Sequence, residues 1–215
     1  HYFWDYSGGD LADCGIHQLD LALMVMSDPA APGAVSASGG RLQHQGDDAE
    51  VPDVEILQYD FPGFVLTFEH SHFANAMSKI NGGIRAGDRF PHWPQCATRI
   101  EFYGTKDNMM LGRHGGGWQV FASNGRVVDQ QYGRHPDLEH QQNFVDCIRS
   151  RDLPNADVGL AQVTTSVMHM GNIAHRVGNQ KLQFDAKSEK FVDDEAANRL
   201  AKRQNVNEFS VTEPV

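Results

Sequence analysis

The chain has 215 residues, of which 40% are hydrophobic and 21% are charged, a composition typical of a globular protein with a sizeable core. Its formal net charge of -10 argues against nucleic acid and anionic membranes as partners, because both would repel it. No apolar run approaches the roughly 18 residues that a membrane span requires.

The chain begins with His1 rather than Met, and its first stretch, HYFWDY, is aromatic. We therefore expect a fragment of a longer protein or a processed chain. This start leaves the compartment open between cytoplasm and periplasm.

A first helix is predicted over 10–26, because two glycines precede it and Pro29 cannot continue it. Three ionisable residues, Asp13, His17 and Asp20, fall within about 60° of arc on this helix. The rest of its circumference is mostly apolar. Such a narrow polar strip is unlike the broad polar face of an ordinary surface helix.

Strand-like segments follow the first helix, and short turns join most of them. The turn Pro62-Gly63 predicts a hairpin. The segment 77–98 is rich in glycine, proline and charge, so we expect a long loop, and such loops are often functional. The predicted strands are 35–38, 54–61, 64–73, 99–103, 109–111, 118–121 and 127–128.

The last part of the chain shows helical patterns. The order of a helix, several strands and then helices predicts an α+β fold. Its sheet would be largely antiparallel and open-faced, with helices packed on one face. The uncovered face predicts a homo-oligomer. We expect one domain over 1–204 and a tail over 205–215. The closing elements are helices at 138–151, 160–177 and 194–204, with a hairpin at 181–192.

The spacing of Asp13 and His17 suits acid–base chemistry, because a carboxylate one helical turn away can orient an imidazole. The pair could take the proton of an alcohol as hydride leaves the same carbon. A structural role remains open, in which the strip caps loops or pairs with arginines. Asp13, His17 and Asp20 could also share a cation, but no HExxH-like motif supports this, and we predict no metal site.

Other chemistries find little support in the sequence. The three cysteines are far apart and form no CxxC pair, which argues against a disulfide framework or a structural zinc site. GGIRAG and RHGGGW match neither a dinucleotide-binding loop nor a P-loop, and no GxSxG motif occurs. The sequence therefore offers an acid–base pair without a cofactor-binding motif.

The stretch SGGDLADCGIHQLDLALMVM resembles the start of the C-terminal domain of the glucose–fructose oxidoreductase / inositol dehydrogenase / MocA (Gfo/Idh/MocA) family. The resemblance to the bacterial branch of that family continues, in order, through VPDVEILQYDFPGFVLTFEH, RIEFYGTKDNMMLGRHGGGW, HQQNFVDCIRSRDLPNADV and GNIAHRVGNQKLQFDAKSEKF. Four matching stretches make a much stronger case than one short motif.

The resemblance implies a two-domain enzyme whose N-terminal Rossmann domain, absent from this chain, binds NAD or NADP. It implies a dihydrodipicolinate-reductase-like C-terminal domain that supplies substrate contacts and the oligomer interface. His17 resembles the catalytic acid/base, and Asp13 the residue that orients it or the substrate. The family's Lys-Pro motif is missing here, so we expect this chain alone to be inactive.

The implied reaction is hydride transfer between nicotinamide and a sugar, polyol or related carbinol. Asp20 and three residues of the long loop, Arg89, His92 and Trp93, are candidate substrate contacts. An ordered surface loop or a subunit contact is an equally open interpretation of that loop. Two other functions stay open: an NAD-dependent glycosidase acting by transient oxidation, and a sugar-binding or dimerisation module without catalysis.

Overall fold

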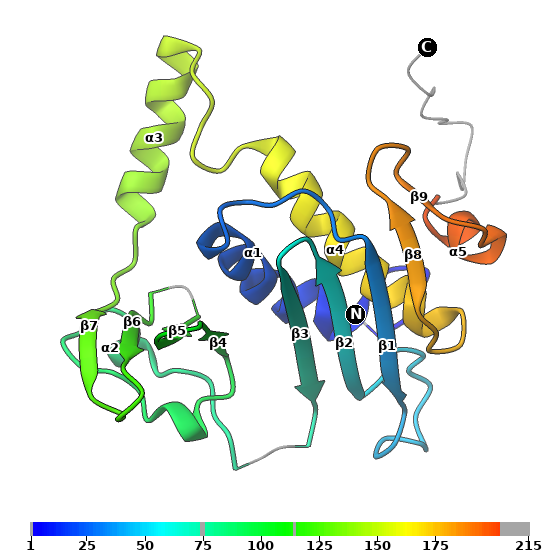
Figure 1. Ribbon diagram of the computed structural model, residues 1–215, viewed down its shortest axis with the longest axis horizontal. Coiled ribbons are helices and arrows are strands. Elements are labelled where there is room, and N and C mark those ends of the chain that lie inside the picture. Colours follow the sequence, from blue (N-terminus) through cyan, green and yellow to red (C-terminus); the bar gives the residue numbers. More distant parts are fainter. Residues whose placement is uncertain (1, 74–75, 114, 203–215) are drawn as a thin grey trace.

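The computed structural model describes residues 2–73, 76–113 and 115–202. Within them the chain forms two antiparallel sheets and several helices, so the predicted α+β class is confirmed (Figure 1). The strands divide between two separate sheets, with the order β3-β2-β1-β8-β9 in one and β4-β5-β6-β7 in the other.

The five-stranded sheet contains the predicted hairpin. β2 pairs with β3 so that Phe61 faces Phe64 across Pro62-Gly63, and Gly63 adopts a φ of +92° that favours glycine. Alternate residues of β2, including Leu57 and Tyr59, are buried. The strands are β1 (Ala34–Gly40), β2 (Val54–Phe61), β3 (Phe64–Ser71), β8 (Leu182–Asp185) and β9 (Lys190–Phe191).

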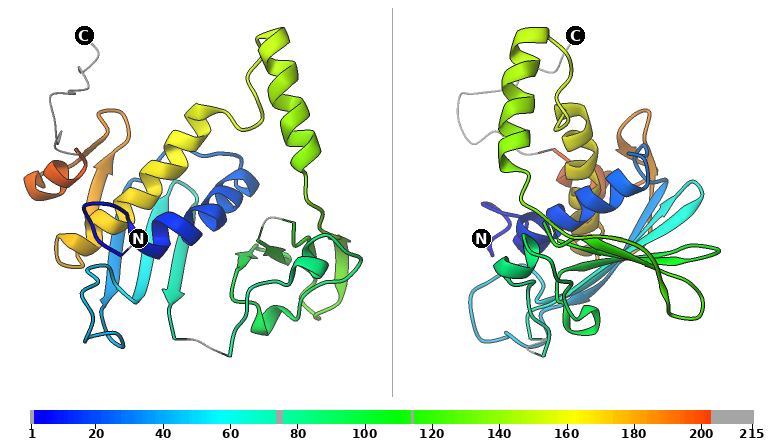
Figure 2. Two further views of the ribbon diagram at one scale, coloured as in Figure 1. Left: turned by 180° about the vertical axis from the view of Figure 1, so that it is seen from behind. Right: turned by 90° about the vertical axis from the view of Figure 1, so that its left-hand side faces the viewer.

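Two helical segments cover one face of this sheet (Figure 2). The first is a π-helical turn, Leu11–Gly15, that continues directly into α1 (Ile16–Val25). The second is α4 (Val158–Arg176), and a Cβ on its Gly171 would lie 2.4 Å from both Leu57 and Tyr59. Glycine at this position therefore lets α4 approach β2 closely, and the main core lies between these helices and the sheet.

The second sheet consists of β4 (Arg99–Tyr103), β5 (Asn108–Gly112), β6 (Trp118–Phe121) and β7 (Val127–Gln131). The segment predicted as a long loop contains two short helical turns, α2 (Gly82–Arg85) and η2 (Trp93–Gln95). Ile80, Trp93 and Cys96 from this segment form a small core against the sheet. The segment therefore carries a core of its own.

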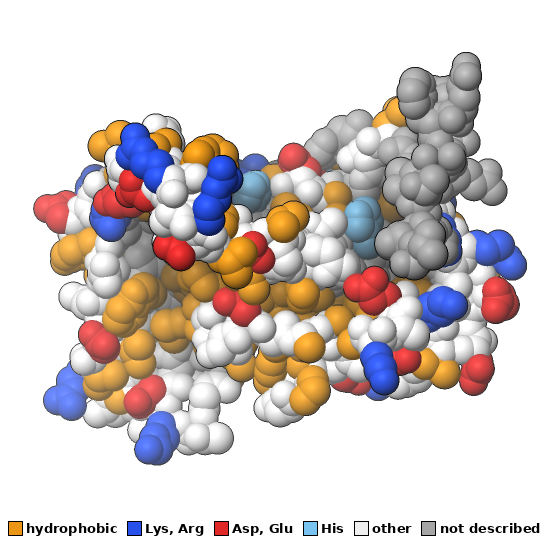
Figure 3. Space-filling model, turned by 90° about the horizontal axis from the view of Figure 1, so that it is seen from above, with side chains coloured by type: hydrophobic (Ala, Val, Ile, Leu, Met, Phe, Trp, Pro, Cys, Tyr) orange, Lys and Arg blue, Asp and Glu red, His pale blue; other side chains and the backbone are white. Residues whose placement is uncertain are grey.

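The remaining helices are α3 (Asp137–Ser150) and α5 (Glu195–Leu200). α3 stands clear of the two sheets and buries none of its residues (Figures 1 and 2). Apolar and charged side chains lie next to one another on its upper end in the space-filling view (Figure 3). No helix in the described ranges has both the length and the apolarity needed to cross a membrane.

The prediction of one domain over 1–204 with a tail over 205–215 stays a prediction. Residues 203–215 lie outside the described residues, so neither the boundary at 204 nor the tail is tested. The C-terminal end of the predicted helix over 194–204 lies there too; its described part is α5, capped by the Asp194 side chain.

Candidate functional site

The first helix carries its predicted polar strip on the outside. Asp13, His17 and Asp20 are all exposed, whereas Leu11, Leu19 and Leu23 on other sides of the helix are buried. The regular helix predicted over 10–26 is interrupted by the π turn, a feature that often marks functional sites.

The π turn packs tightly on the sheet. A Cβ on Gly15 would lie 2.8 Å from the ring of Phe68 on β3, so glycine is required for this close approach. The turn contains Asp13, and His17 follows in the first turn of α1. Packing at Gly15 therefore fixes the segment that presents the predicted acid–base pair.

A cysteine and a lysine lie next to Asp13. The Cys14 thiol donates to Asp13 Oδ2 at 3.6 Å, and Lys79 Nζ donates to Cys14 Sγ at the same distance. Lys79 comes from the segment after β3, 65 residues further along the chain. Sequence patterns gave no reason to group these residues, and the fold brings a positive charge to the turn that holds Asp13.

Tyr2 also belongs to this neighbourhood. The Asp10 carboxylate is the largest cause that raises the pKa of Tyr2, followed by burial and by Asp13. The charges of Asp10 and Asp13 therefore both act on the Tyr2 phenol and disfavour its ionised form.

Asp20 has a partner on the neighbouring helix. The hydroxyl of Thr164, a buried residue of α4, donates to Asp20 Oδ1 at 3.1 Å. This bond joins α1 to α4 across the core. Asp20 thus has a structural use in this fold, and its exposed carboxylate keeps further lone pairs for the predicted substrate contact.

The three predicted residues of the long loop differ in exposure. Arg89 and His92 are exposed. Trp93 is only 7% exposed, packs in the small core, and donates its indole N–H to Gln119 Oε1 at 2.8 Å. This burial favours a packing role for Trp93 over stacking on a sugar ring.

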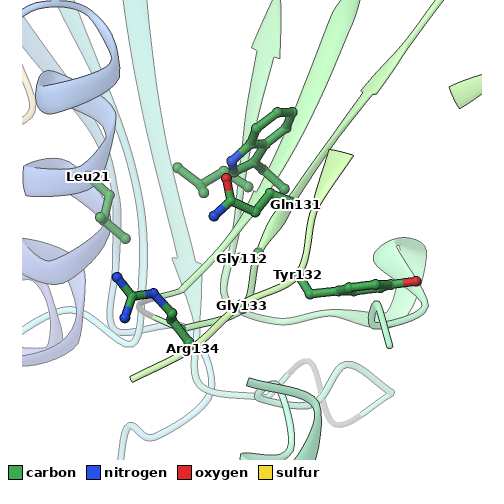
Figure 4. Close-up of a pocket in the computed structure, with 11 residues that line it drawn as sticks. Leu21, Gly112, Gln131, Tyr132, Gly133 and Arg134 are labelled. Carbon is green, nitrogen blue, oxygen red and sulfur yellow. The ribbon is translucent and has the colours of Figure 1, made fainter. Parts of the chain in front are cut away.

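A pocket of about 180 Å³ lies between α1 and the second sheet. Leu21 points into it from α1, Arg134 extends toward the helix, and Tyr132 points away to stack on Phe90 (Figure 4). Leu21 comes one helical turn after His17, so the pocket begins next to the predicted acid/base. Its wall is formed by Leu111, Gly112, Gly115–Gly117, Trp118, Gln131, Tyr132, Gly133 and Arg134.

Glycines shape the floor of this pocket. A Cβ on Gly133 would lie 1.5 Å from the carbonyl oxygen of Gly115, so any side chain there would collide with the backbone. Gly115 and Gly117 have φ values of +85° and +73°. Gly115–Gly117 therefore form a tight structural segment whose backbone lies beside the pocket.

A second group of ionisable residues lies where the first helix begins. Asp10, His70 and His72 offer ligand-type atoms that all lie within 4.8 Å of one another. Beneath them, burial raises the pKa of Glu55 to about 7, and its side chain is 0% exposed. Both histidines fall in the predicted strand 64–73, and no sequence pattern joined them to Asp10. The His-x-His spacing, which places both rings on one side of a strand, was the available signal.

Two family models match the chain. Residues 1–109 match the one described as "GFO/IDH/MocA C-terminal domain", and residues 100–211 match the one described as "Oxidoreductase family, C-terminal alpha/beta domain". The two matches overlap at residues 100–109, close to β4, where the second sheet begins. Together they leave only the last four residues, 212–215, unmatched. No curated protein sequence matched the chain.

Solved structures share the fold at low sequence identity. A protein from Klebsiella pneumoniae that is described as an oxidoreductase has a TM-score of 0.56 and 14% identity. The match covers 93% of this chain and 55% of that chain. A protein from Desulfitobacterium hafniense that is described as an NADPH-dependent oxidoreductase has a TM-score of 0.57 and 15% identity. The match covers 86% of this chain and 50% of that chain.

A third similar structure is the UDP-N-acetylglucosamine 3-dehydrogenase of Acidithiobacillus ferrooxidans. Its TM-score is 0.54 at 16% identity, and the match covers 77% of this chain and 46% of that chain. At such identities the likeness shows the fold alone. The chain spans about half the length of these three structures.

Proposed function

Since this chain belongs to the GFO/IDH/MocA family of oxidoreductases, we propose that it forms the substrate-binding and oligomerisation domain of an NAD(P)-dependent enzyme. The reaction is hydride transfer between nicotinamide and a sugar, polyol or related carbinol. The names of two similar structures, an NADPH-dependent oxidoreductase and a UDP-sugar dehydrogenase, support this substrate and cofactor class.

The cofactor is held mainly by a second, dinucleotide-binding domain. The sequence contains no G-x-G-x-x-G loop, and its glycines 115–117 build a tight structural segment. When bound, NAD or NADP supplies the hydride acceptor. The remaining tasks, which are binding the substrate and moving the proton, fall to residues of this chain.

His17 acts as the acid/base in this proposal. It takes the proton from the substrate hydroxyl while the hydride leaves the same carbon, so the carbinol becomes a ketone and the proton stays on the imidazole. Asp13, one turn earlier, orients the imidazole or the substrate. The observation that carries the assignment is the exposure of both side chains on an otherwise apolar helix.

The substrate lies against α1 in the pocket that starts at Leu21. A sugar or polyol would place a hydroxyl at His17 and its other hydroxyls against the backbone of the glycines that line the pocket. Arg134 offers a guanidinium at the pocket rim for an anionic group, such as a phosphate of a sugar nucleotide. Arg89 and His92 remain candidate contacts from the long loop because both are exposed.

The test uses the natural polypeptide together with its dinucleotide-binding domain. A panel of UDP-sugars, free hexoses, glycosides and inositols is screened with NAD⁺ and NADP⁺ for nicotinamide reduction. His17→Ala should lower kcat on the best substrate by about 10²-fold or more, because the proton acceptor is lost. His140→Ala, on the exposed helix α3, is the matched histidine control and should keep wild-type kcat.

Two results would contradict the proposal. Near-wild-type kcat for His17→Ala would remove His17 from the chemistry. A folded polypeptide that binds NAD(P) but reduces none with any compound of the panel would count against a sugar or polyol dehydrogenase.

A further inference from the structure

The end of β3 and the start of the first helix bring together three side chains of types that bind metals. Asp10, His70 and His72 offer one carboxylate and two imidazoles whose ligand atoms all lie within 4.8 Å of one another. Asp10 Oδ2 and His72 Nε2 are already in direct contact. We propose that these three residues bind a divalent transition-metal ion of the zinc class.

The spacing of the cluster fits such an ion. Two ligands at about 2.0 Å from a tetrahedral zinc ion lie about 3.3 Å apart, so ligand atoms within 4.8 Å need only small side-chain movements. His70 lies on β3 and His72 follows directly after the strand ends, and their ring centroids are 5.6 Å apart. Two imidazoles and one carboxylate suit zinc, iron, cobalt or nickel better than magnesium or calcium, which prefer oxygen ligands.

An independent observation comes from the buried groups behind the cluster. Glu55 is 0% exposed and His70 is mostly buried. Within the described residues, neither carboxylate oxygen of Glu55 has a hydrogen-bond partner. Buried polar groups without partners are rare in folded proteins and require an explanation.

A metal ion on His70 would explain the buried Glu55 carboxylate. Glu55 Oε2 lies 3.8 Å from His70 Nδ1. If Nε2 of His70 binds the ion, the opposite Nδ1 carries a proton and can donate it to Glu55 after a small approach. Carboxylates behind metal-binding histidines commonly fix the ring in this way.

The cluster borders a pocket, which leaves room for an additional ligand. Three protein ligands leave a fourth position on a zinc-class ion for water or for an oxygen of a bound molecule. A pocket of about 210 Å³ opens beside His72 and is lined by Tyr2, Arg41, His44, Asp47, Ala49, Val51 and Asp53. The ion would also tie the start of the helix that carries Asp13 and His17 to the end of β3.

The test measures metal binding by the tag-free natural polypeptide after treatment with a chelator. Calorimetric titration with Zn²⁺ should show one equivalent bound, and Co²⁺ should give visible absorption bands that Zn²⁺ abolishes by competition. Asp10→Asn and His72→Gln should lose this equivalent. His140→Gln should retain it, because His140 lies on α3, far along the chain from the cluster.

Two further measurements keep the result interpretable. Zn²⁺ should raise the Tm of the wild type but not of Asp10→Asn, whose side chain is 22% exposed and tolerates the change without a cavity. Glu55→Gln should weaken binding by about 10-fold, since it weakens the acceptor for His70 without removing a ligand.

Absence of a saturable equivalent in the wild type would overturn the proposal. So would equal binding by the wild type, Asp10→Asn and His72→Gln. Because the readout is metal binding, either result is independent of dehydrogenase activity.

Discussion

The hydroxyl of Thr164 on α4 donates a hydrogen bond to Asp20 Oδ1 on α1 at 3.1 Å. The two residues are 144 positions apart, and Thr164 is buried between the helices. Asp20, one member of the predicted polar strip, therefore joins the two helices.

We expect Thr164→Val to lower the free energy of unfolding by about 1 kcal/mol, because it removes the donor while keeping the shape of the side chain. For a chain of this size that corresponds to a Tm lower by about 2–4 °C. Asp20→Ala should lose a similar amount, and the double variant should lose less than the sum of the two. Thermal denaturation of the four proteins measures this coupling.

Asp20→Asn keeps an acceptor oxygen for Thr164 and serves as the control for the coupling. It should retain both stability and turnover. A variant that keeps its Tm but loses more than about tenfold in kcat/KM would instead show that the carboxylate contacts the substrate.

Much of the fold was predictable because its signals are local. Turn residues at Pro62-Gly63 and the alternation of 54–61 predicted the β2–β3 hairpin, and the helix predicted over 160–177 ends one residue after α4 does. The exposure of Asp13 and His17 followed from helical periodicity alone. These features depend on residues a few positions apart, which is where sequence patterns carry information.

The misses all involve residues that are distant in sequence. Gly15 of the π turn packs against Phe68 on β3, and the buried indole of Trp93 donates to Gln119 on β6. The division into two sheets depends on which strand edges pair, which alternation does not specify. The Asp10 cluster required β3 to end beside the helix start, so no single stretch of sequence contains it.

Acid should destabilise the loop between β1 and β2, because protonation of Asp53 weakens the hydrogen bonds that its carboxylate accepts from that loop. Burial alone would raise the pKa of Asp53, but backbone N–H groups of Leu42, Gln43 and His44 bind its carboxylate and lower the pKa to about 2. Because the pKa in the folded state lies below the ordinary value of 3.8, the stabilisation is complete above about pH 4. It is lost as the pH falls toward 2.

Urea unfolding at pH 5 and at pH 2.5 measures this contribution. The wild type should lose about 2 kcal/mol more than Asp53→Asn over this interval, since the variant has no group to titrate there. Equal losses in the two proteins would show that the carboxylate is not held by the loop N–H groups in solution.

The uncovered face of the five-stranded sheet supports self-association. Ile56 on β2 and Val65 on β3 lie on the side opposite α1 and α4 and are 47% and 60% exposed. We expect the wild type to be a homo-oligomer in light scattering, and Ile56→Lys with Val65→Lys to reduce its mass to that of a monomer. Val128→Lys, on the second sheet, is the control and should leave the mass unchanged. A monomeric wild type would rule out this interface.

Filling the pocket beside His17 should impair substrate binding more than chemistry. Leu21 is partly buried at the pocket wall, so Leu21→Trp would occupy much of its 180 Å³. We expect KM for the best substrate of the panel to rise by about tenfold or more, with a smaller change in kcat, because His17 itself is untouched. Met24→Trp, three residues later and exposed, adds the same ring outside the pocket and should behave as the wild type. If both tryptophan variants kept the wild-type KM, the substrate would have to bind on another side of α1.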